Sequence, residues 1–196
     1  MSGGRDISEV SFEKGIRLAT PSDSAALSAI YAPIVETTAT SFETTVPTSD
    51  EMAQRVSDTL LTHPWLVCEN DEGVAGYAYG CPHRTRAAYR WSCDVSVYVD
   101  ERARGQGMGR RLYDALFPLL KRQGFVRAHA GIVLPNAASV ALHEGCGFGP
   151  VGIYKNVGYK FGQWRDVGWW ALTLNDPEAT PLEPIPWADI SRQFSI

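Results

Sequence analysis

Two periodicities of apolar residues alternate along this chain and predict a domain built from both helices and strands. Stretches with apolar residues every three or four positions follow helix start signals and are typical of amphipathic helices. Stretches with continuous or alternating apolar residues are typical of strands. The helical stretches are 20–35, 49–60, 107–123 and 136–144, and the strand-like stretches are 15–19, 65–69, 74–79, 91–99, 128–134, 151–157 and 166–174. This order, β-α-α-β-β-β-α-β-α-β-β, predicts an α+β fold with a mixed sheet.

Turn and breaker residues sharpen the boundaries of these elements. Asn70-Asp71-Glu72-Gly73 predicts a hairpin turn between two strands. Pro33 is expected to end or kink the first helix, because proline lacks the N–H that a helix interior needs. We expect a flexible segment at 1–14 and one folded domain at 15–175. A Pro-rich tail at 176–196 is expected to lie as extended coil on the surface or on a partner.

Composition and charge narrow the class of protein. Of the 196 residues 44% are hydrophobic and 20% are charged, and the net charge is -4. We therefore expect no nucleic-acid partner, which would require a basic surface. The N-terminal MSGGRDISEV has no apolar run, and no stretch approaches the ~20 apolar residues of a membrane span. These features predict a cytoplasmic protein with no membrane partner.

The cysteines are consistent with the same compartment. Cys68, Cys81, Cys93 and Cys146 form no Cys-x-x-Cys pair, and most fall in strand-like or core-like contexts. We interpret them as reduced residues that pack as small hydrophobic side chains. The four histidines show no ligand spacing with them, so no metal is expected.

A glycine-rich segment between a strand and a helix carries the first chemical signal. Arg104-Gly105-Gln106-Gly107-Met108-Gly109 follows a Val-x-Val strand, and a helix begins at about Gly107. The first amides of a helix lack internal partners and the helix dipole is positive there, so such a segment can bind an anion. Arg104, Arg110 and Arg111 add positive charge on an otherwise acidic protein.

Two common phosphate-binding motifs do not fit this segment. A Walker A loop requires Gly-Lys-Ser/Thr, whereas the chain has Gly109-Arg110-Arg111. A dinucleotide fingerprint would require glycine at position 110 or 112, where Arg110 and Leu112 stand. A glycine-rich turn without a ligand stays open at this point.

The surroundings of the segment resemble a known family. Arg104-x-x-Gly107-x-Gly109 after a Val-x-Val strand resembles motif A of the GNAT superfamily of N-acetyltransferases, and Asn136–Ser139 with His143–Phe148 resembles its next helix. Other stretches resemble the phosphinothricin N-acetyltransferase family; they are Tyr31–Ile34, Thr40–Phe42, Pro64–Val67, Ser96–Val99 and Gly158–Gly168. The resemblance covers about residues 16–174. It implies the GNAT fold, a mixed sheet of about six to seven strands flanked by helices on both faces, and a homodimer.

The resemblance also implies how acetyl-CoA is held. The pantetheine arm would pair with the backbone of the Val-x-Val strand, and the pyrophosphate would lie on the amides of the glycine loop. Asn136 would reach the pantetheine through its side-chain amide; a plain helix cap is the alternative for this residue. The cofactor-binding residues implied are Val97, Tyr98, Val99, Arg104, Gly105, Gln106, Gly107, Met108, Gly109, Arg110 and Asn136.

Acetyl transfer to an amine requires a base, stabilisation of the thioester oxygen and a proton for the leaving thiolate. Asp94 stands where the family carries a glutamate as its proposed base, and its shorter side chain favours proton transfer through a water. Backbone amides near Val97 are the expected oxyanion donors. His143 stands where many superfamily members carry the tyrosine that protonates the thiolate. The alternatives are a solvated strand residue for Asp94 and a packed or solvated helix residue for His143.

The acceptor pocket is expected to include Arg84, Thr85 and Arg86, with Asp94 and Ser96 facing it. Arg84 matches a substrate-binding arginine of the family, and a guanidinium suits a carboxylate or phosphinate bidentately. Solvated loop arginines are the alternative. The expected substrate is a small amino acid or a toxic analogue, such as phosphinothricin, methionine sulfoximine or methionine sulfone, which would make the reaction a detoxification.

Aromatic residues and other activities complete the expectations. Phe42, Tyr89 and Trp91 are candidates for walls of the pocket, and Trp164, Trp169 and Trp170 are interpreted as core or dimer interface. A protein, peptide or polyamine acceptor is the rival within the enzyme class, although paired arginines argue against a polyamine. A catalytically silent acyl-CoA-binding sensor is the rival outside it, favoured only by the change from glutamate to Asp94.

Overall fold

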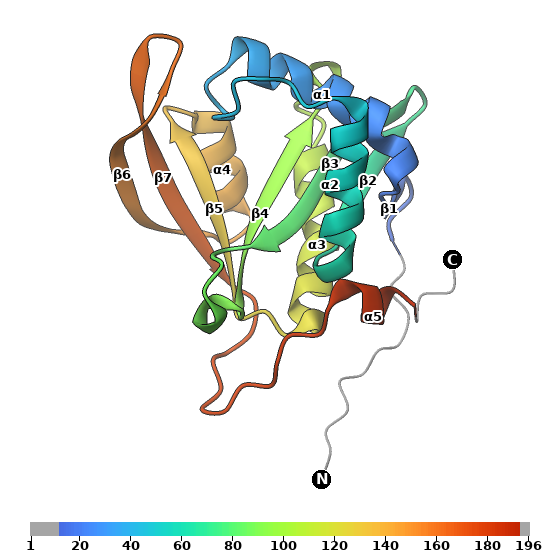
Figure 1. The fold of residues 1–196 in the computed structure, drawn as a ribbon, viewed down its shortest axis with the longest axis vertical. Helices are drawn as coiled ribbons and strands as arrows, with labels where there is room; N and C mark the ends of the chain where they lie inside the picture. Colours follow the sequence, from blue (N-terminus) through green and yellow to red (C-terminus); the bar gives the residue numbers. More distant parts are fainter. Residues whose placement is uncertain (1–11, 193–196) are drawn as a thin grey trace.

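The computed structural model of this chain describes residues 12–192. The flexible segment expected at 1–14 therefore lies outside the described residues up to residue 11, as do residues 193–196 of the tail. The described part folds into a seven-stranded sheet with helices on both faces (Figure 1). This confirms the α+β architecture that the order of elements predicts.

The sheet is mixed, and its strands lie in the order β1-β2-β3-β4-β5-β7-β6. Neighbouring strands are antiparallel except β4 and β5, which run parallel. The strands are β1 Ile16–Leu18, β2 Trp65–Asn70, β3 Gly73–Pro82, β4 Ser92–Val99, β5 Arg127–Leu134, β6 Gly149–Lys160 and β7 Gln163–Thr173. A parallel pair cannot be joined by a tight turn, so helix α3 (Met108–Gln123) crosses over between β4 and β5.

The helices divide the core into two layers. Besides α3, the helices are α1 Ser24–Thr37, α2 Ser49–Thr62, α4 Ala137–Gly145 and α5 Trp187–Ser191. The 3-10 turns are η1 Pro21–Asp23, η2 Ala87–Tyr89 and η3 Glu101–Ala103. Leu112, Leu116 and Leu120 of α3 are fully buried in the core on one face of the sheet. Leu27 of α1 and Val56 of α2 are fully buried in the core on the other face.

Strand β4 shows how alternation in the sequence serves both cores. Cys93 and Val95 belong to the core under α3, whereas Tyr98 packs against the core under α1 and α2. Successive side chains of a strand point to opposite faces. Asp94 and Ser96 therefore share the α1–α2 face with Tyr98.

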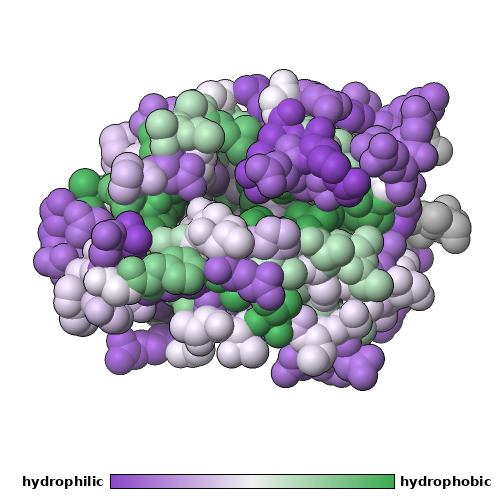
Figure 2. All heavy atoms as spheres, turned by 90° about the horizontal axis from the view of Figure 1, so that it is seen from above, coloured by the Kyte–Doolittle hydropathy of each residue, from purple (hydrophilic) through white to green (hydrophobic). Residues whose placement is uncertain are grey.

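The contact between β4 and β5 is short, and the two strands diverge beyond it. They pair only from Ser92 to Asp94, opposite Arg127 to His129. Beyond this point β5 stays paired with β7, while β4 continues to Val99 with β3 as its only strand partner within residues 12–192. The V between the two strands opens upward in Figure 1. Figure 2 looks onto this end and shows apolar surface exposed between polar margins.

Of the two outcomes expected at Pro33, an end or a kink of the first helix, the end is wrong. Helix α1 continues to Thr37 with Pro33 inside it. Ile34 and Val35 are buried and hold this turn against the sheet, and the Thr37 hydroxyl donates a hydrogen bond to the Pro33 carbonyl at 2.6 Å. Packing of this apolar face outweighs the one backbone hydrogen bond that proline removes.

The tail departs from the expected surface coil near its end. Residues 177–186 contain neither helix nor strand. Trp187 and Ile190 of α5, however, are only 1% and 2% exposed and belong to the core under α3. The Gln123 side chain donates a hydrogen bond to the Ile185 carbonyl at 2.8 Å. The folded domain thus extends beyond residue 175, because two large apolar side chains of the tail complete its core.

Within residues 12–192 no helix is long and apolar enough to cross a bilayer. No group of three or more histidine, cysteine, aspartate or glutamate side chains in the same range could hold a metal ion. Cys68, Cys81, Cys93 and Cys146 are all unpaired.

Candidate active site

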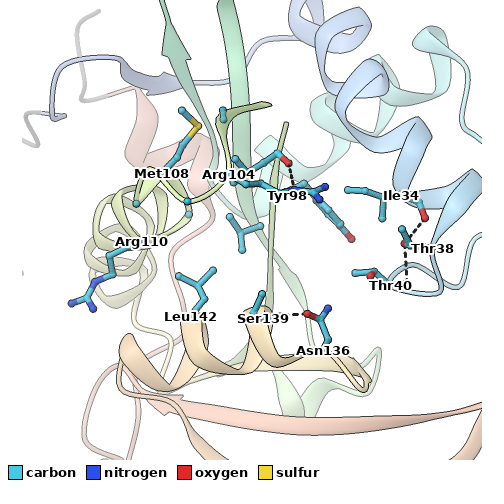
Figure 3. A pocket seen from close by; sticks show the side chains of 17 residues that line it. Ile34, Thr38, Thr40, Tyr98, Arg104, Met108, Arg110, Asn136, Ser139 and Leu142 are labelled. Carbon is cyan, nitrogen blue, oxygen red and sulfur yellow. Dashed lines mark hydrogen bonds between the residues drawn. The ribbon is translucent and has the colours of Figure 1, made fainter. Parts of the chain in front are cut away.

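A cavity of about 410 Å³ lies between β4, the glycine loop and α4 (Figure 3). Its lining includes all the residues expected to hold the cofactor except Gln106; these are Val97, Tyr98, Val99, Arg104, Gly105, Gly107, Met108, Gly109, Arg110 and Asn136. The Gln106 side chain instead donates to the Arg102 carbonyl at 3.4 Å. One continuous cavity thus joins the free end of β4 to the start of α3.

The start of α3 offers unpaired amides to this cavity. The helix begins at Met108, and its N-cap Gly107 has a left-handed backbone with φ of 76°. No group within residues 12–192 accepts a hydrogen bond from the backbone amides of 105–110. Such amides, aligned with the helix dipole, suit a phosphate group.

The arginines around the loop differ in their availability. The Arg104 Nε donates to the Val99 carbonyl at 3.3 Å, and Arg104 lines the cavity. Arg110 binds Asp114 at 2.9 Å and points away from the centre of the cavity (Figure 3). Arg111 is turned to Glu13 at 2.9 Å. The positive charge expected from three arginines is therefore supplied to the cavity chiefly by Arg104.

Asn136 caps helix α4 and still has a free donor. Its Oδ1 accepts a hydrogen bond from the Ser139 amide at 3.1 Å. Within residues 12–192 no acceptor binds its Nδ2 group, and Asn136 lines the cavity. The two interpretations of this residue are thus compatible, because one side-chain atom caps the helix and the other faces the ligand space.

A narrow slot of about 60 Å³ continues from this cavity between the diverging strands. Val95–Tyr98 of β4 form one side and Ala130–Val133 of β5 form the other. Ser96 lies in this lining, as expected of an acceptor-side residue. Because β4 has no strand partner on its β5 side here within residues 12–192, its backbone groups that face the slot can bind an extended ligand arm.

His143 closes the slot from the α3–α4 side and is only 4% exposed. Its Nδ1 donates to the Ser139 carbonyl at 2.7 Å, since a carbonyl can only accept. Its Nε2 therefore accepts a hydrogen bond from the Tyr113 hydroxyl at 2.9 Å. Burial lowers the pKa of His143, so the ring is neutral near pH 7.

Asp94 lies at the closed end of the V and is bound to a histidine that the sequence analysis did not single out. The Nδ1 of His83 donates to Asp94 Oδ1 at 2.6 Å. The two side chains are 13% and 24% exposed, so Asp94 is not a freely solvated residue. Burial raises the pKa of Asp94 above its ordinary value, and the hydrogen bond from His83 opposes this rise.

His83 is embedded in aromatic rings. It stacks on His129, with ring centroids 4.3 Å apart and planes inclined by 18°. Tyr89 lies edge-on to it, with ring centroids 5.8 Å apart. Burial lowers the pKa of His129 to about 4, so that ring carries no charge at neutral pH.

Trp169 joins this cluster to the slot. Its ring lies 3.2–3.4 Å from the Cβ position of Gly131, a residue of the slot lining. The Arg84 guanidinium lies 5.4 Å from the centre of the same ring. His83 lies edge-on to it at 5.9 Å. Trp169 is thus half-buried, and it contacts the slot, Arg84 and His83.

Arg84, Thr85 and Arg86 line a second cavity, of about 260 Å³, which the tail residues Glu183 and Ile185 border on the other side. Only Arg84 also lies on Trp169. The structure therefore brings Arg84 and Asp94 together through His83 and Trp169, whereas within residues 12–192 the side chains of Thr85 and Arg86 make no hydrogen bond or ring contact with this group.

The remaining aromatic candidates have other partners. The Trp91 Nε1 donates to the Leu182 carbonyl at 2.9 Å and is covered by the tail. Phe42 packs against Gly158 of β6. Trp170 is 8% exposed in the core, whereas Trp164 is 63% exposed. Of these four residues, only Trp170 belongs to the buried core of the described chain.

Several residues of the site were missed by sequence reasoning. Thr38 and Thr40, from the segment after α1, line the cavity opposite α4, and Tyr113 lines the slot. Thr40 falls in a run that the family resemblance covers, whereas His83 lies between two predicted strands, where no pattern marks it. Their positions depend on contacts between segments far apart in the chain.

Known proteins show the same fold and related sequences. A family model described as "Acetyltransferase (GNAT) domain" matches residues 16–169. A phosphinothricin N-acetyltransferase of Streptomyces viridochromogenes is 38% identical over 171 residues, which cover 87% of this chain and 93% of the relative. An L-methionine sulfoximine/L-methionine sulfone acetyltransferase of Salmonella typhimurium is 36% identical over 165 residues, covering 84% and 96%.

A solved structure agrees with these relatives. The phosphinothricin acetyltransferase of Sinorhizobium meliloti, in complex with acetyl-CoA, superposes with a TM-score of 0.82 and 34% identity. The match covers 87% of this chain and 94% of that chain.

Proposed function

This chain belongs to the GNAT superfamily of N-acetyltransferases, and from this premise we propose that it transfers the acetyl group of acetyl-CoA to the amine of a small amino acid or a toxic analogue of one. The observation that carries the proposal is the junction of two features. A cavity with unpaired amides at the start of α3 leads into the slot beside the unpartnered edge of β4. The site so formed fits a long ligand with phosphates at one end and a reacting carbonyl at the other.

The residues present fit acetyl-CoA from its pyrophosphate to its thioester. The amides of 105–110 and Arg104 would hold the pyrophosphate. The backbone edge of Val97 to Val99 and the Nδ2 of Asn136 would hold the pantetheine arm, with the Arg104 side chain moving off the Val99 carbonyl that it now binds. The thioester carbonyl would then lie in the slot, where the amide of Val97 is the proposed oxyanion donor. Binding along a strand edge orients the thioester before the amine arrives.

His143 and Tyr113 are the proposed groups on the thiolate side. The amine forms the new C–N bond, the C–S bond breaks, and the leaving sulfur takes up a proton. The His143 ring is neutral, and its Nε2 accepts a hydrogen bond from the Tyr113 hydroxyl. We propose that this hydrogen-bonded pair holds, at the side of the slot, the proton that the leaving sulfur takes up. Replacing His143 with phenylalanine should lower kcat more than it raises the KM for acetyl-CoA.

Arg84 is the proposed contact for the acid group of the acceptor. Its guanidinium lies on Trp169, which in turn lies on the slot residue Gly131. A guanidinium binds a carboxylate or phosphinate through two parallel hydrogen bonds. Phosphinothricin, methionine sulfoximine and methionine sulfone are amino acids of this kind, and relatives of this chain are named for acting on them.

A panel of acceptors tests the proposed function. Release of free CoA thiol would be measured with phosphinothricin, methionine sulfoximine, methionine sulfone, a peptide with a free N-terminus and a polyamine. We expect the highest kcat/KM for one of the amino acids and the N-acetyl product by mass. Higher kcat/KM for the peptide or the polyamine would overturn the proposed acceptor class. Binding of acetyl-CoA without turnover on any acceptor would count against this set of substrates.

We further propose that two copies of the chain associate through β6. This strand is at the edge of the sheet, and apolar side chains on both of its faces are half exposed or more; they are Val151, Ile153, Tyr154, Val157 and Tyr159. An unpaired edge with such side chains is a surface that proteins usually cover. A second copy of the chain supplies the same apolar strand to cover it.

The unpaired cysteines are consistent with a cytoplasmic enzyme.

A further inference from the structure

The hydrogen bond between His83 and Asp94 fixes the state of the imidazole. Nδ1 of His83 is 2.6 Å from Asp94 Oδ1. An ionised carboxylate only accepts hydrogen bonds, so Nδ1 carries the hydrogen. In the neutral ring Nε2 then carries the lone pair. Within residues 12–192 no group hydrogen-bonds Nε2, so this basic nitrogen is free to take a proton from a ligand.

The surroundings hold this ring in one position. His129 stacks on one face, Trp169 and Tyr89 lie edge-on, and the strand that carries Asp94 is paired on both sides at that residue. The Nη1 of Arg84 donates to the His83 carbonyl at 2.7 Å. An imidazole confined in this way keeps its orientation without a large entropic cost when a substrate binds.

The same surroundings connect the ring to both ends of an amino-acid substrate. Trp169 contacts the slot residue Gly131, carries the Arg84 guanidinium on its face and meets His83 at its edge. Asp94 and Ser96 lie on one face of β4, about 7 Å apart along the strand. An amino acid with its carboxylate on Arg84 and its amine at the slot therefore lies beside His83.

We propose that His83 is the catalytic base that removes the proton from the acceptor's ammonium group at Nε2, and that Asp94 is a positioning residue that holds the ring through Nδ1. This inference rests on the proposed function, and it assigns to a histidine the role expected of the carboxylate. His129 is a second positioning residue, because its ring supports His83 by stacking.

The step balances in protons and electrons. The N–H bond of the ammonium group breaks, and its proton forms a new bond to Nε2. The freed lone pair of the amine forms the C–N bond to the thioester carbon, and the C–S electron pair leaves with the sulfur. The tetrahedral nitrogen loses a second proton and the sulfur gains one. His83 then returns its proton to solvent, which restores the neutral ring.

Charges around the pair favour this division of roles. The titratable or charged groups that face it are Cys81 on β3, Arg84 in the following loop, Tyr89 on η2 and His129 on β5. Burial raises the pKa of the Cys81 thiol to about 12 and lowers that of His129 to about 4, so both are neutral at pH 7. Among the described residues Asp94 is thus the one negative charge beside His83, and it stabilises the imidazolium that forms.

Replacement of His83 by glutamine tests the role of the base. Glutamine can still donate a hydrogen bond to Asp94 but cannot take up a proton. We expect His83→Gln to lower kcat/KM for the acceptor roughly 10²–10³-fold. The fall of kcat/KM toward low pH, which reports protonation of the base, should disappear. The Kd of acetyl-CoA should stay within about 2-fold, because none of the lining of the cofactor cavity is changed.

Asp94→Asn, alone and combined with His83→Gln, tests whether His83 and Asp94 act as one unit or as two independent groups. The asparagine amide can donate a hydrogen bond to Nδ1 of His83, which favours the tautomer with its hydrogen on Nε2. Nε2 then has no lone pair with which to act as the base. We expect the double variant to be no slower than the slower single variant, because groups that act as one unit are not additive. His63→Gln is the matched control, since His63 is a buried histidine at the end of α2 that stacks on Phe125 and contacts neither His83 nor Asp94. Folding of all variants would be checked by thermal unfolding.

Two results would overturn the proposal. One is a His83→Gln enzyme that keeps its acid-side pH dependence and loses less than about 3-fold in kcat/KM; Asp94 would then act directly. The other is independent of turnover. Long-range proton–nitrogen NMR of the unmodified protein should show hydrogen on Nδ1 of His83, and hydrogen on Nε2 would contradict the geometry. This spectrum distinguishes failure of the proposal from failure of the proposed function.

Discussion

One indole ring organises the acceptor side of the site. Trp169 lies opposite Gly131 in the sheet, and glycine at that position lets the ring lie close to the backbone. The ring then supports Arg84 on its face and meets His83 at its edge. Contacts between a guanidinium and an aromatic ring stabilise both partners and limit the motion of the arginine. A fixed guanidinium binds an acidic substrate with a smaller loss of entropy.

Substitution of Arg84 tests its role at the residue scale. Loss of a charge-assisted pair of hydrogen bonds corresponds to about 1.5–3 kcal/mol. Arg84→Gln should therefore raise the KM for an acidic amino-acid acceptor roughly 10–100-fold, and Arg84→Lys should have an intermediate effect. Steady-state kinetics at saturating acetyl-CoA would measure both.

The same change at Arg86 identifies which cavity binds the acceptor. Arg86 faces the second cavity beside the tail. If Arg86→Gln raised the acceptor KM more than Arg84→Gln does, the acceptor would bind in that second cavity, and the assignment of Arg84 would be wrong.

Residues of this kind are where sequence reasoning reached its limit. Asp94 and Arg84 could be singled out because each is a charged residue at a position that the family resemblance marks. His83 could not, because its pairing with Asp94 depends on the register of the β3–β4 hairpin, in which Pro82 lies opposite Cys93. The loop sequence does not fix that register. Trp169 looked like a core residue because aromatic burial is the commoner outcome.

At the scale of elements, the turn into α3 determines how the phosphates are bound. Gly107 adopts a left-handed backbone with open space where a Cβ would stand. A side chain there would strain the backbone by about 1–2 kcal/mol and disturb the aligned amides. We expect Gly107→Ala to weaken acetyl-CoA binding about 10-fold or more, as measured by calorimetry.

Gly73, the first residue of β3 after its turn with β2, provides a matched control for this prediction. It also has a left-handed backbone, with φ of 114° and open space around its Cβ position. Gly73→Ala should lower the free energy of unfolding by about as much as Gly107→Ala does, and it should leave the Kd of acetyl-CoA unchanged. An equal loss of affinity in both variants would mean that general destabilisation, and not the loop, controls binding.

The elements themselves were largely predictable, because each depends on local periodicity. The order of strands and helices follows from apolar spacing, and the capping pair Thr48 and Glu51 begins α2 close to the expected residue. Two departures have tertiary causes. Pro33 stays inside α1 because its neighbours are buried. Helix α5 forms because Trp187 fills a gap in the core, which no pattern within the tail reveals.

At the scale of the whole molecule, the exposed β6 edge predicts a dimer. Ile153→Asp places a charge in the apolar surface, where Ile153 is 50% exposed, and should give a monomer in light scattering. Leu61→Asp on α2 is the control, since Leu61 is 60% exposed but lies away from β6. A monomeric unmodified protein at micromolar concentration, or a dimer that Ile153→Asp does not affect, would refute this interface.

A crystal structure of the protein with CoA and methionine sulfoximine tests the central claim most directly. We predict the CoA phosphates on the amides at the start of α3 and its sulfur in the slot between β4 and β5. The carboxylate of the amino acid should lie on Arg84, and its amine should face both the sulfur and Nε2 of His83. An amino acid bound in the cavity beside the tail, or an amine turned away from His83 and the slot, would contradict the account.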